Sequence, residues 1–109
     1  MGKMQRRKGH NFERKIAAQL NPIYPQTRRG LQYRDGEECC DVEGTPFHIE
    51  CSCGGQSIWA KIRQAQEDSH TTSRPWVVIK KQDFEKAIVV MDFETFKGIL
   101  KELKEKVNE

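Results

Sequence analysis

Two carboxylates, Asp41 and Glu50, lie on the two arms of a predicted β-hairpin. Strand-forming residues flank the Gly-Thr-Pro turn cluster at 44–46, and a two-residue loop at 45–46 places Asp41 directly opposite Glu50. Opposed residues on antiparallel strands share one face of the sheet, with Cβ atoms roughly 5 Å apart. Carboxylates that close repel each other unless a proton or a metal ion lies between them, and Mg²⁺ prefers carboxylate, water and phosphate oxygens. The hairpin therefore predicts a divalent-metal site, and a solvated face carrying ordinary acids is the alternative.

Glu13 and Lys61 are charged residues within the apolar stripes of two predicted helices, over 11–20 and 57–68. A carboxylate at the edge of a buried face needs a partner, which a metal site or an arginine would supply. The ammonium of Lys61 must likewise reach either the predicted site or the solvent. A metal site or an arginine is therefore expected beside Glu13, and Lys61 is expected to reach the site or the solvent; simple exposure at the helix edge is the alternative for each.

The other apolar patterns complete the predicted elements. Strands are expected over 26–34, 39–43, 47–53, 76–79 and 87–91, the last two as apolar runs covered on both faces. A third helix carries the stripe Phe96, Ile99, Leu100, Leu103 and Val107, and the helix N-caps are expected at Asn11, Ser57 and Asp92. The order α-β-β-β-α-β-β-α predicts one α/β domain over 10–109, a mixed β-sheet flanked by helices, after a flexible basic arm over 1–9.

The length of 109 residues suits one domain with one core. No apolar run approaches the roughly 20 residues that span a membrane, and the basic N-terminus lacks the apolar stretch of a signal peptide. We therefore expect a cytoplasmic protein with reduced thiols. Of the four cysteines, at 39, 40, 51 and 53, only Cys40 and Cys51 would share a face of the hairpin. Buried thiols are favoured over structural zinc, which is the alternative.

Basic residues are concentrated in the first third of the chain. Through Arg34 there are nine lysines and arginines against one acidic residue, whereas the remainder holds ten basic and fifteen acidic residues. This asymmetry favours a polyanionic partner, most often nucleic acid. A solubilising tail is the alternative for residues 3–8. The residues expected to contact DNA are Arg6, Arg7, Lys8, Arg14, Arg28 and Arg29.

Short motifs along nearly the whole chain are similar to those of one nuclease family. They are Gly9-x-x-Phe12-Glu13-Arg14, Arg28-Arg29-Gly30, Asp41-Val42, Ile49-Glu50-Cys51, Arg63-Gln64-Ala65 and Arg74-Pro75-x-Val77-Val78. Together they resemble the PD-(D/E)xK nuclease superfamily and, within it, the archaeal-type and phage-encoded Holliday junction resolvases. The resemblance implies a restriction-endonuclease-like fold and a Mg²⁺- or Mn²⁺-dependent homodimer that cleaves four-way DNA junctions in recombination and repair. It implies no small-molecule cofactor and a bacterial, archaeal or phage-encoded origin.

The resemblance also assigns roles to residues of the predicted site. Glu13, Asp41 and Glu50 would hold one or two metal ions, and Arg28 and Arg29 would bind the phosphates flanking the cut. Ser52 stands where the family has its catalytic lysine, and Cys40 stands where the family usually has proline. Lys61 is expected to replace the missing lysine, and Gln64 to hydrogen-bond the attacking water or the water shell of the metal.

Three other functions fit the same residues. A restriction-like or repair nuclease acting on other DNA would share the site, because fold does not determine substrate. An inactive DNA-binding descendant would tolerate the loss of the lysine, and a zinc-stapled interaction module would use the cysteines. For the homodimer, the expected interface is formed by the apolar runs 76–79 and 87–91 with Trp76 or Trp59.

Overall fold

Three helices and seven strands follow one another in the computed structural model, which describes residues 3–30, 33–34, 37–38, 40–55 and 57–108. The helices are α1 (Lys3–Leu20), α2 (Ile58–Ser69) and α3 (Phe93–Asn108). The strands are β1 (Arg28–Arg29), β2 (Tyr33–Arg34), β3 (Glu37–Glu38), β4 (Val42–Glu43), β5 (His48–Cys53), β6 (Trp76–Lys81) and β7 (Ile88–Val90). None of the described helices is long and apolar enough to cross a membrane.

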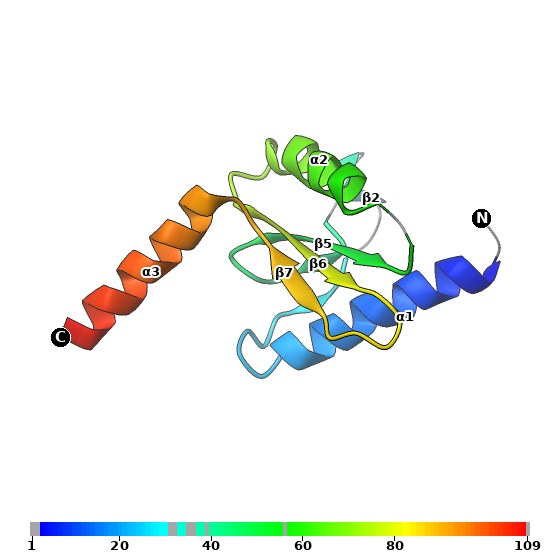
Figure 1. The fold of residues 1–109 in the computed structure, drawn as a ribbon, viewed down its shortest axis with the longest axis horizontal. Helices are drawn as coiled ribbons and strands as arrows, with labels where there is room; N and C mark the ends of the chain where they lie inside the picture. The colour runs from blue at the N-terminus through cyan, green and yellow to red at the C-terminus, as the bar shows by residue number, and fades with distance from the viewer. Residues whose placement is uncertain (1–2, 31–32, 35–36, 39, 56, 109) are drawn as a thin grey trace.

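Five strands form one mixed sheet in the spatial order β1-β4-β5-β6-β7 (Figure 1), and β2 pairs separately with β3. Strands β5 and β6 run parallel, whereas the other neighbouring pairs run antiparallel. In the hairpin, Val42 pairs with Ile49, which is the register predicted to place Asp41 opposite Glu50. The predicted single-domain α/β class with a mixed sheet is therefore confirmed.

Helices α1 and α2 cover opposite faces of the central strands (Figure 1). Side chains alternate between these faces along β5, because successive residues of a strand point in opposite directions. The α1-side core consists of Phe12, Ile16, Ala17, Val42, Ile49, Cys51, Val77 and Ile79. The α2-side core is smaller and consists of Ile62, Ala65, Trp76 and Val78. The prediction that strand 76–79 is covered on both faces is thus confirmed.

Helix α1 begins at Lys3, well before the predicted start near Asn11. Most of the expected flexible arm is therefore the first half of this helix, because lysine, arginine, glutamine and methionine are good helix formers. Asn11 is not an N-cap but lies within the helix, where its side chain accepts a hydrogen bond from Arg14. Ser57 and Asp92, in contrast, cap α2 and α3 as predicted. Their side chains accept hydrogen bonds from the backbone N–H groups of Ala60 and Thr95, respectively.

The expected strand over 26–34 is interrupted after Arg29. Gly30 lies so close to the hairpin that an added Cβ would be 1.9 Å from the backbone oxygen of Cys40. Its N–H donates a hydrogen bond to the backbone oxygen of Asp41 at 2.7 Å. The close approach requires glycine and ends β1 after two residues.

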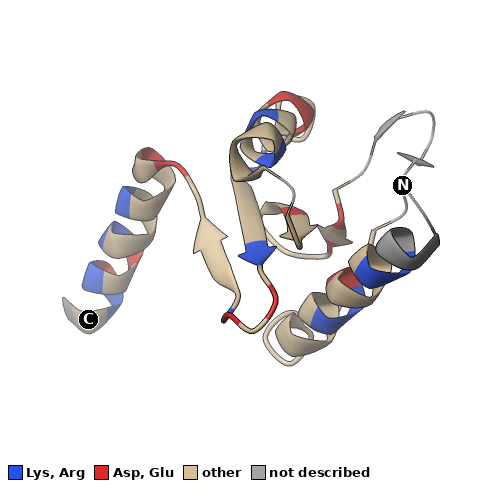
Figure 2. Ribbon diagram, turned by 45° about the vertical axis from the view of Figure 1, so that its right-hand side comes forward, with Lys and Arg blue, Asp and Glu red and all other residues tan. Residues whose placement is uncertain are grey.

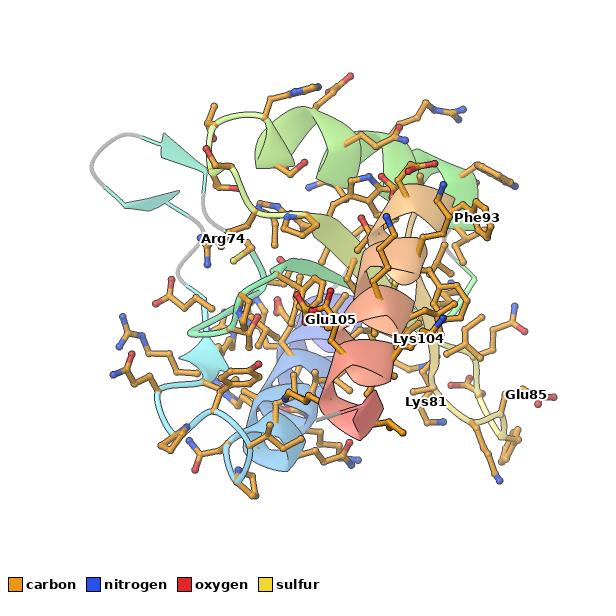
Figure 3. The ribbon with its side chains drawn as sticks, turned by 90° about the vertical axis from the view of Figure 1, so that its left-hand side faces the viewer. Arg74, Lys81, Glu85, Phe93, Lys104 and Glu105 are labelled. Atoms are coloured by element: carbon orange, nitrogen blue, oxygen red, sulfur yellow. The ribbon has the colours of Figure 1, made fainter. Side chains whose placement is uncertain are left out.

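Helix α3 projects away from the sheet, in contrast to the predicted flanking position (Figure 1), and lies nearest the viewer in Figure 3. Its apolar stripe is largely exposed, with exposed fractions of 45% for Phe96, 56% for Leu103 and 84% for Val107. The prediction that strand 87–91 is covered on both faces is also wrong, since Ile88 and Val89 are more than half exposed. The reason is that β7 is the edge strand of the sheet and α3 does not fold back over it.

Candidate active site

The hairpin brings Asp41 and Glu50 together as the sequence predicts. Gly44 turns the chain with a φ of +96°, and an added Cβ there would be 2.3 Å from the backbone oxygen of Gln26. Asp41 lies just before β4, and its Oδ2 accepts a hydrogen bond from the N–H of Cys51 at 2.8 Å. This bond fixes the aspartate carboxylate beside the strand that carries Glu50, whose side chain is buried.

Lys61 reaches this pair of carboxylates from α2. Its Nζ lies 3.2 Å from Oδ2 of Asp41 and 3.5 Å from Oε2 of Glu50, and the residue is 8% exposed. Burial disfavours the ammonium, but the charges of Asp41 and Glu50 outweigh burial and raise the pKa of Lys61. Lys61 therefore stays protonated and points into the site, which excludes simple exposure at the helix edge.

Glu13 approaches the same group from α1. Its Oε2 is buried without a hydrogen-bond partner and lies 3.6 Å from Nε of Arg29 on β1. Burial and the nearby charge of Asp41 raise the pKa of Glu13 to about 7, although Arg29 and Lys61 oppose the shift. The orphaned oxygen and the raised pKa both mean that this carboxylate lacks enough positive charge around it.

Glu50 is in a similar electrostatic position. Burial raises its pKa to about 7, the hydrogen bond with His48 acts against the rise, and Asp41 adds to it. The site thus holds three carboxyl groups against the cations of Lys61 and Arg29. Their oxygen donors are of the kind that Mg²⁺ and Mn²⁺ prefer, so the residues present fit a divalent ion.

Ser52, two residues after Glu50 on β5, contacts the ammonium of a second lysine. Lys80 is its partner on the neighbouring strand β6, and Nζ of Lys80 donates to Oγ of Ser52 at 3.2 Å and to the backbone oxygen of Gly54 at 2.8 Å. Both residues are buried. The sequence reasoning did not find Lys80, because the pairing depends on the parallel register of β5 with β6, which no local pattern determines.

Gln64 lies one turn after Lys61 on α2 and is half-buried. No hydrogen bond joins it to the site carboxylates among the described contacts. Its predicted role toward water or metal stays a prediction.

His48 and Asp68 are site residues that the sequence reasoning missed. One imidazole nitrogen of His48, one oxygen of Glu50 and one of Asp68 lie within 4.8 Å of one another, and among the described residues this group alone places three ligating side chains so close. Glu13 does not join Asp41 and Glu50 in so tight a group. The sequence held a signal for both residues, since His48 is two residues before Glu50 on one strand face and Asp68 is two turns after Lys61.

The predicted DNA-binding residues fall into two sets. Arg7, Lys8 and Arg14 are exposed on α1, where basic residues gather (Figure 2), while the side chain of Arg6 lies outside the described part. Arg28 is paired with Glu43 at 2.6 Å, and Arg29 faces Glu13. Lys8 is also paired, with Asp83 at 2.7 Å. Arg29 is therefore placed to neutralise a site carboxylate.

The described cysteines give no support to a zinc-stapled module. Cys40 donates through Sγ to the backbone oxygen of Val42, and Cys51 is part of the α1-side core. Cys40, Cys51 and Cys53 are free thiols, and none joins a described metal-ligating group; Cys39 lies outside the described residues.

The site as a whole combines buried carboxylates with an ammonium fixed beside two of them. This arrangement can hold a divalent cation and present a positive charge to an anionic substrate. The chain matches no protein-family model, no curated protein and no solved structure in comparisons with all three.

Proposed function

We propose that this protein is a Mg²⁺- or Mn²⁺-dependent endodeoxyribonuclease with a restriction-endonuclease-like fold, of the Holliday junction resolvase type. The observation that carries the proposal is the position of Lys61, whose ammonium contacts both Asp41 and Glu50. The resemblance described above has a lysine two residues after the glutamate, and here that position is Ser52. A lysine delivered from α2 to the same two carboxylates restores the positive charge that the chemistry needs.

The metal, when bound, would lower the pKa of a coordinated water and neutralise charge developing on the phosphodiester. Asp41 and Glu50 would hold the ion, with Glu13 adding a third carboxylate from α1. Lys61 would stabilise negative charge on the scissile phosphate as an ammonium, since its raised pKa makes it a poor general base. Arg29 would favour the ionised form of Glu13 by its proximity, against the burial that raises the pKa of this carboxyl group.

DNA would bind along the basic side of α1. A groove of about 780 Å³ runs between α1 and the 81–87 segment, lined by basic residues that include Arg7, Lys8, Lys15, Lys81 and Lys86. Contacts of this kind are with phosphates, so binding would be independent of sequence and weaken steeply as salt is added.

The proposed active form is a homodimer, with one site for each of two opposed strands of a junction. The expected interface needs correction, because Trp76 and the rest of strand 76–79 are buried and cannot contact a second subunit. The exposed apolar residues include instead Trp59, Ile88, Val89 and, on α3, Phe93, Phe96, Leu100, Leu103 and Val107. We propose that this surface pairs the two subunits.

Cleavage of a labelled four-way junction and of a matched linear duplex, with Mg²⁺ and with Mn²⁺, tests the proposal. Wild type should nick the junction symmetrically. Asp41→Asn and Lys61→Met should each lower the rate by roughly 10²–10³-fold while junction affinity changes little. Lys101→Met, at an exposed lysine outside the site and the groove, is the matched control and should cleave at nearly the wild-type rate.

Lys80→Met decides between the two buried lysines. If Lys80→Met abolishes cleavage and Lys61→Met does not, the ammonium at Ser52 is the functional one and the assignment of Lys61 is wrong. Cleavage of the duplex as fast as the junction would favour a restriction-like or repair nuclease of the same fold.

The second candidate function is an inactive DNA-binding protein. It is favoured by the same contact, because Lys61 already neutralises Asp41 and Glu50 as a metal ion would. Tight, salt-sensitive junction binding without cleavage by the wild type in either metal would establish this function and contradict the nuclease.

A further inference from the structure

The two oxygens of Glu50 face different partners. Oε2 lies 3.5 Å from the ammonium of Lys61, on the side of Asp41. Oε1 lies 2.9 Å from Nε2 of His48, on the same strand. Glu50 therefore belongs to two groups at once, the proposed catalytic group and a second one beneath α2.

The second group contains polar atoms that nothing in the described structure satisfies. His48 is fully buried and its Nδ1 has no hydrogen-bond partner. Asp68 has a buried Oδ2, likewise without a partner. A buried polar atom without a partner is costly, so Oδ2 of Asp68 needs a partner that the described protein does not supply. In His48 the nitrogen that faces Glu50 is Nε2, and Nδ1 lies on the far edge of the ring, so Nε2 is the nitrogen that an ion shared with Glu50 would use.

What this second group lacks is a positive charge. Glu50 and Asp68 bring two carboxylates to His48, with one donor atom from each residue within 4.8 Å of the other two. Of the two oxygens of Glu50, Lys61 lies nearest Oε2, which faces away from this group. Among the described residues, no lysine or arginine forms an ion pair with Asp68. Two carboxylates and an imidazole that converge in this way are the donor set of a divalent transition-metal site.

We propose that His48, Glu50 and Asp68 bind a divalent transition-metal ion, of the Mn²⁺, Co²⁺ or Zn²⁺ class. The imidazole nitrogen favours such an ion over Mg²⁺, which prefers oxygen donors. His48 and Glu50 are fixed on the central strand β5, and half-buried Asp68 near the end of α2 gives the ion a way in. The site would exist whether or not the protein cleaves DNA, because none of its ligands except Glu50 touches the proposed catalytic group.

The nitrogen ligand provides a direct test with Mn²⁺ alone. Pulsed electron paramagnetic resonance distinguishes a nitrogen bound to the ion by its ¹⁴N coupling, which is larger than that of a nitrogen farther away, and the carboxylates of the proposed catalytic group supply no such ligand. The chain has three histidines, of which His10 and His70 are exposed. The full-length double variant His10→Gln/His70→Gln, whose core is unchanged, should keep the ¹⁴N coupling of the wild type.

Asp68→Asn should weaken this Mn²⁺ site by at least about tenfold, and His48→Gln should remove the coupling. Glu67→Gln, at the exposed neighbour of Asp68, is the matched control and should bind as wild type does. Asp41→Asn should keep the coupling, which separates this site from the proposed catalytic one. Wild type without ¹⁴N coupling, or a coupling lost in the double variant, would overturn the proposal even if either core variant fails to fold.

Discussion

The two faces of strand β5 differ in chemistry although they belong to the same six residues. Toward α1, Ile49 and Cys51 pack into the larger apolar core. Toward α2, His48, Glu50 and Ser52 are equally buried, but their neighbours are Lys61 and Lys80. One face stabilises the fold, and the other keeps ionisable groups away from water at a cost in stability. The buried charges of the α2 face are therefore in keeping with the function proposed above, whereas the α1 face contributes packing.

Shortening a side chain on the α1 side should cause the largest loss of stability. Phe12 is 8% exposed and belongs to the α1-side core, so Phe12→Ala should lower the free energy of unfolding by about 3–5 kcal/mol. Urea unfolding followed by circular dichroism measures the change. Phe84→Ala, at a fully exposed residue outside the proposed dimer surface, is the control and should change it by about 0.5 kcal/mol or less. Equal losses would contradict the assignment of the fold's stability to the α1 side.

Removing a buried charge on the α2 side should have a smaller, pH-dependent effect. In the metal-free protein the pKa of Glu50 is raised from 4.5 to about 7, so its favourable contribution is complete below about pH 4.5 and is lost as the pH rises through about 7. Glu50→Gln should therefore reduce the fall in unfolding free energy across this range, by an amount on the order of 1–3 kcal/mol. Urea unfolding at pH 5 and pH 8 measures it.

The matched variant for this comparison is Glu43→Gln on β4, a residue outside the site and paired with Arg28. It should leave the pH dependence nearly unchanged. A wild type whose stability is constant between pH 5 and pH 8 would show that Glu50 is ionised throughout, and the contrast between the two faces would fail.

The smallest effect on a single subunit is expected on α3. Leu103 is 56% exposed, so Leu103→Ser should change the free energy of unfolding of the monomer by less than about 0.5 kcal/mol. The same variant should dissociate the proposed dimer, which analytical ultracentrifugation over a range of concentrations measures. A wild type that stays monomeric at all concentrations would contradict the proposed pairing through this surface.

Local patterns predicted the hairpin and the position of Lys61 correctly. The turn at 44–46 determines the register that places Asp41 beside Glu50, and the helical period places Lys61 on the buried side of α2. The cluster of His48 with Asp68 requires α2 to be docked on β5, and the contact of Lys80 with Ser52 requires the register of β5 with β6. Both depend on contacts distant in sequence, which periodicity does not encode.

The position of α3 could not be predicted for a related reason. An amphipathic stripe indicates that a helix face will be covered, but it does not say by what. The predicted packing on the sheet assumed that the cover comes from the same chain. The exposed residues Ile88 and Leu103 show that in a single chain the cover is incomplete.

Gly30 allows β1 and the hairpin to approach each other closely, because it has no side chain. Asp41 is held at three points: its backbone oxygen accepts from the N–H of Gly30, its carboxylate accepts from the N–H of Cys51, and its own N–H donates to the backbone oxygen of Ile49. A single methyl group at residue 30 would clash with the backbone oxygen of Cys40. The distance between Asp41 and the ammonium of Lys61 is therefore set by the absence of a side chain at a residue that takes no part in the chemistry.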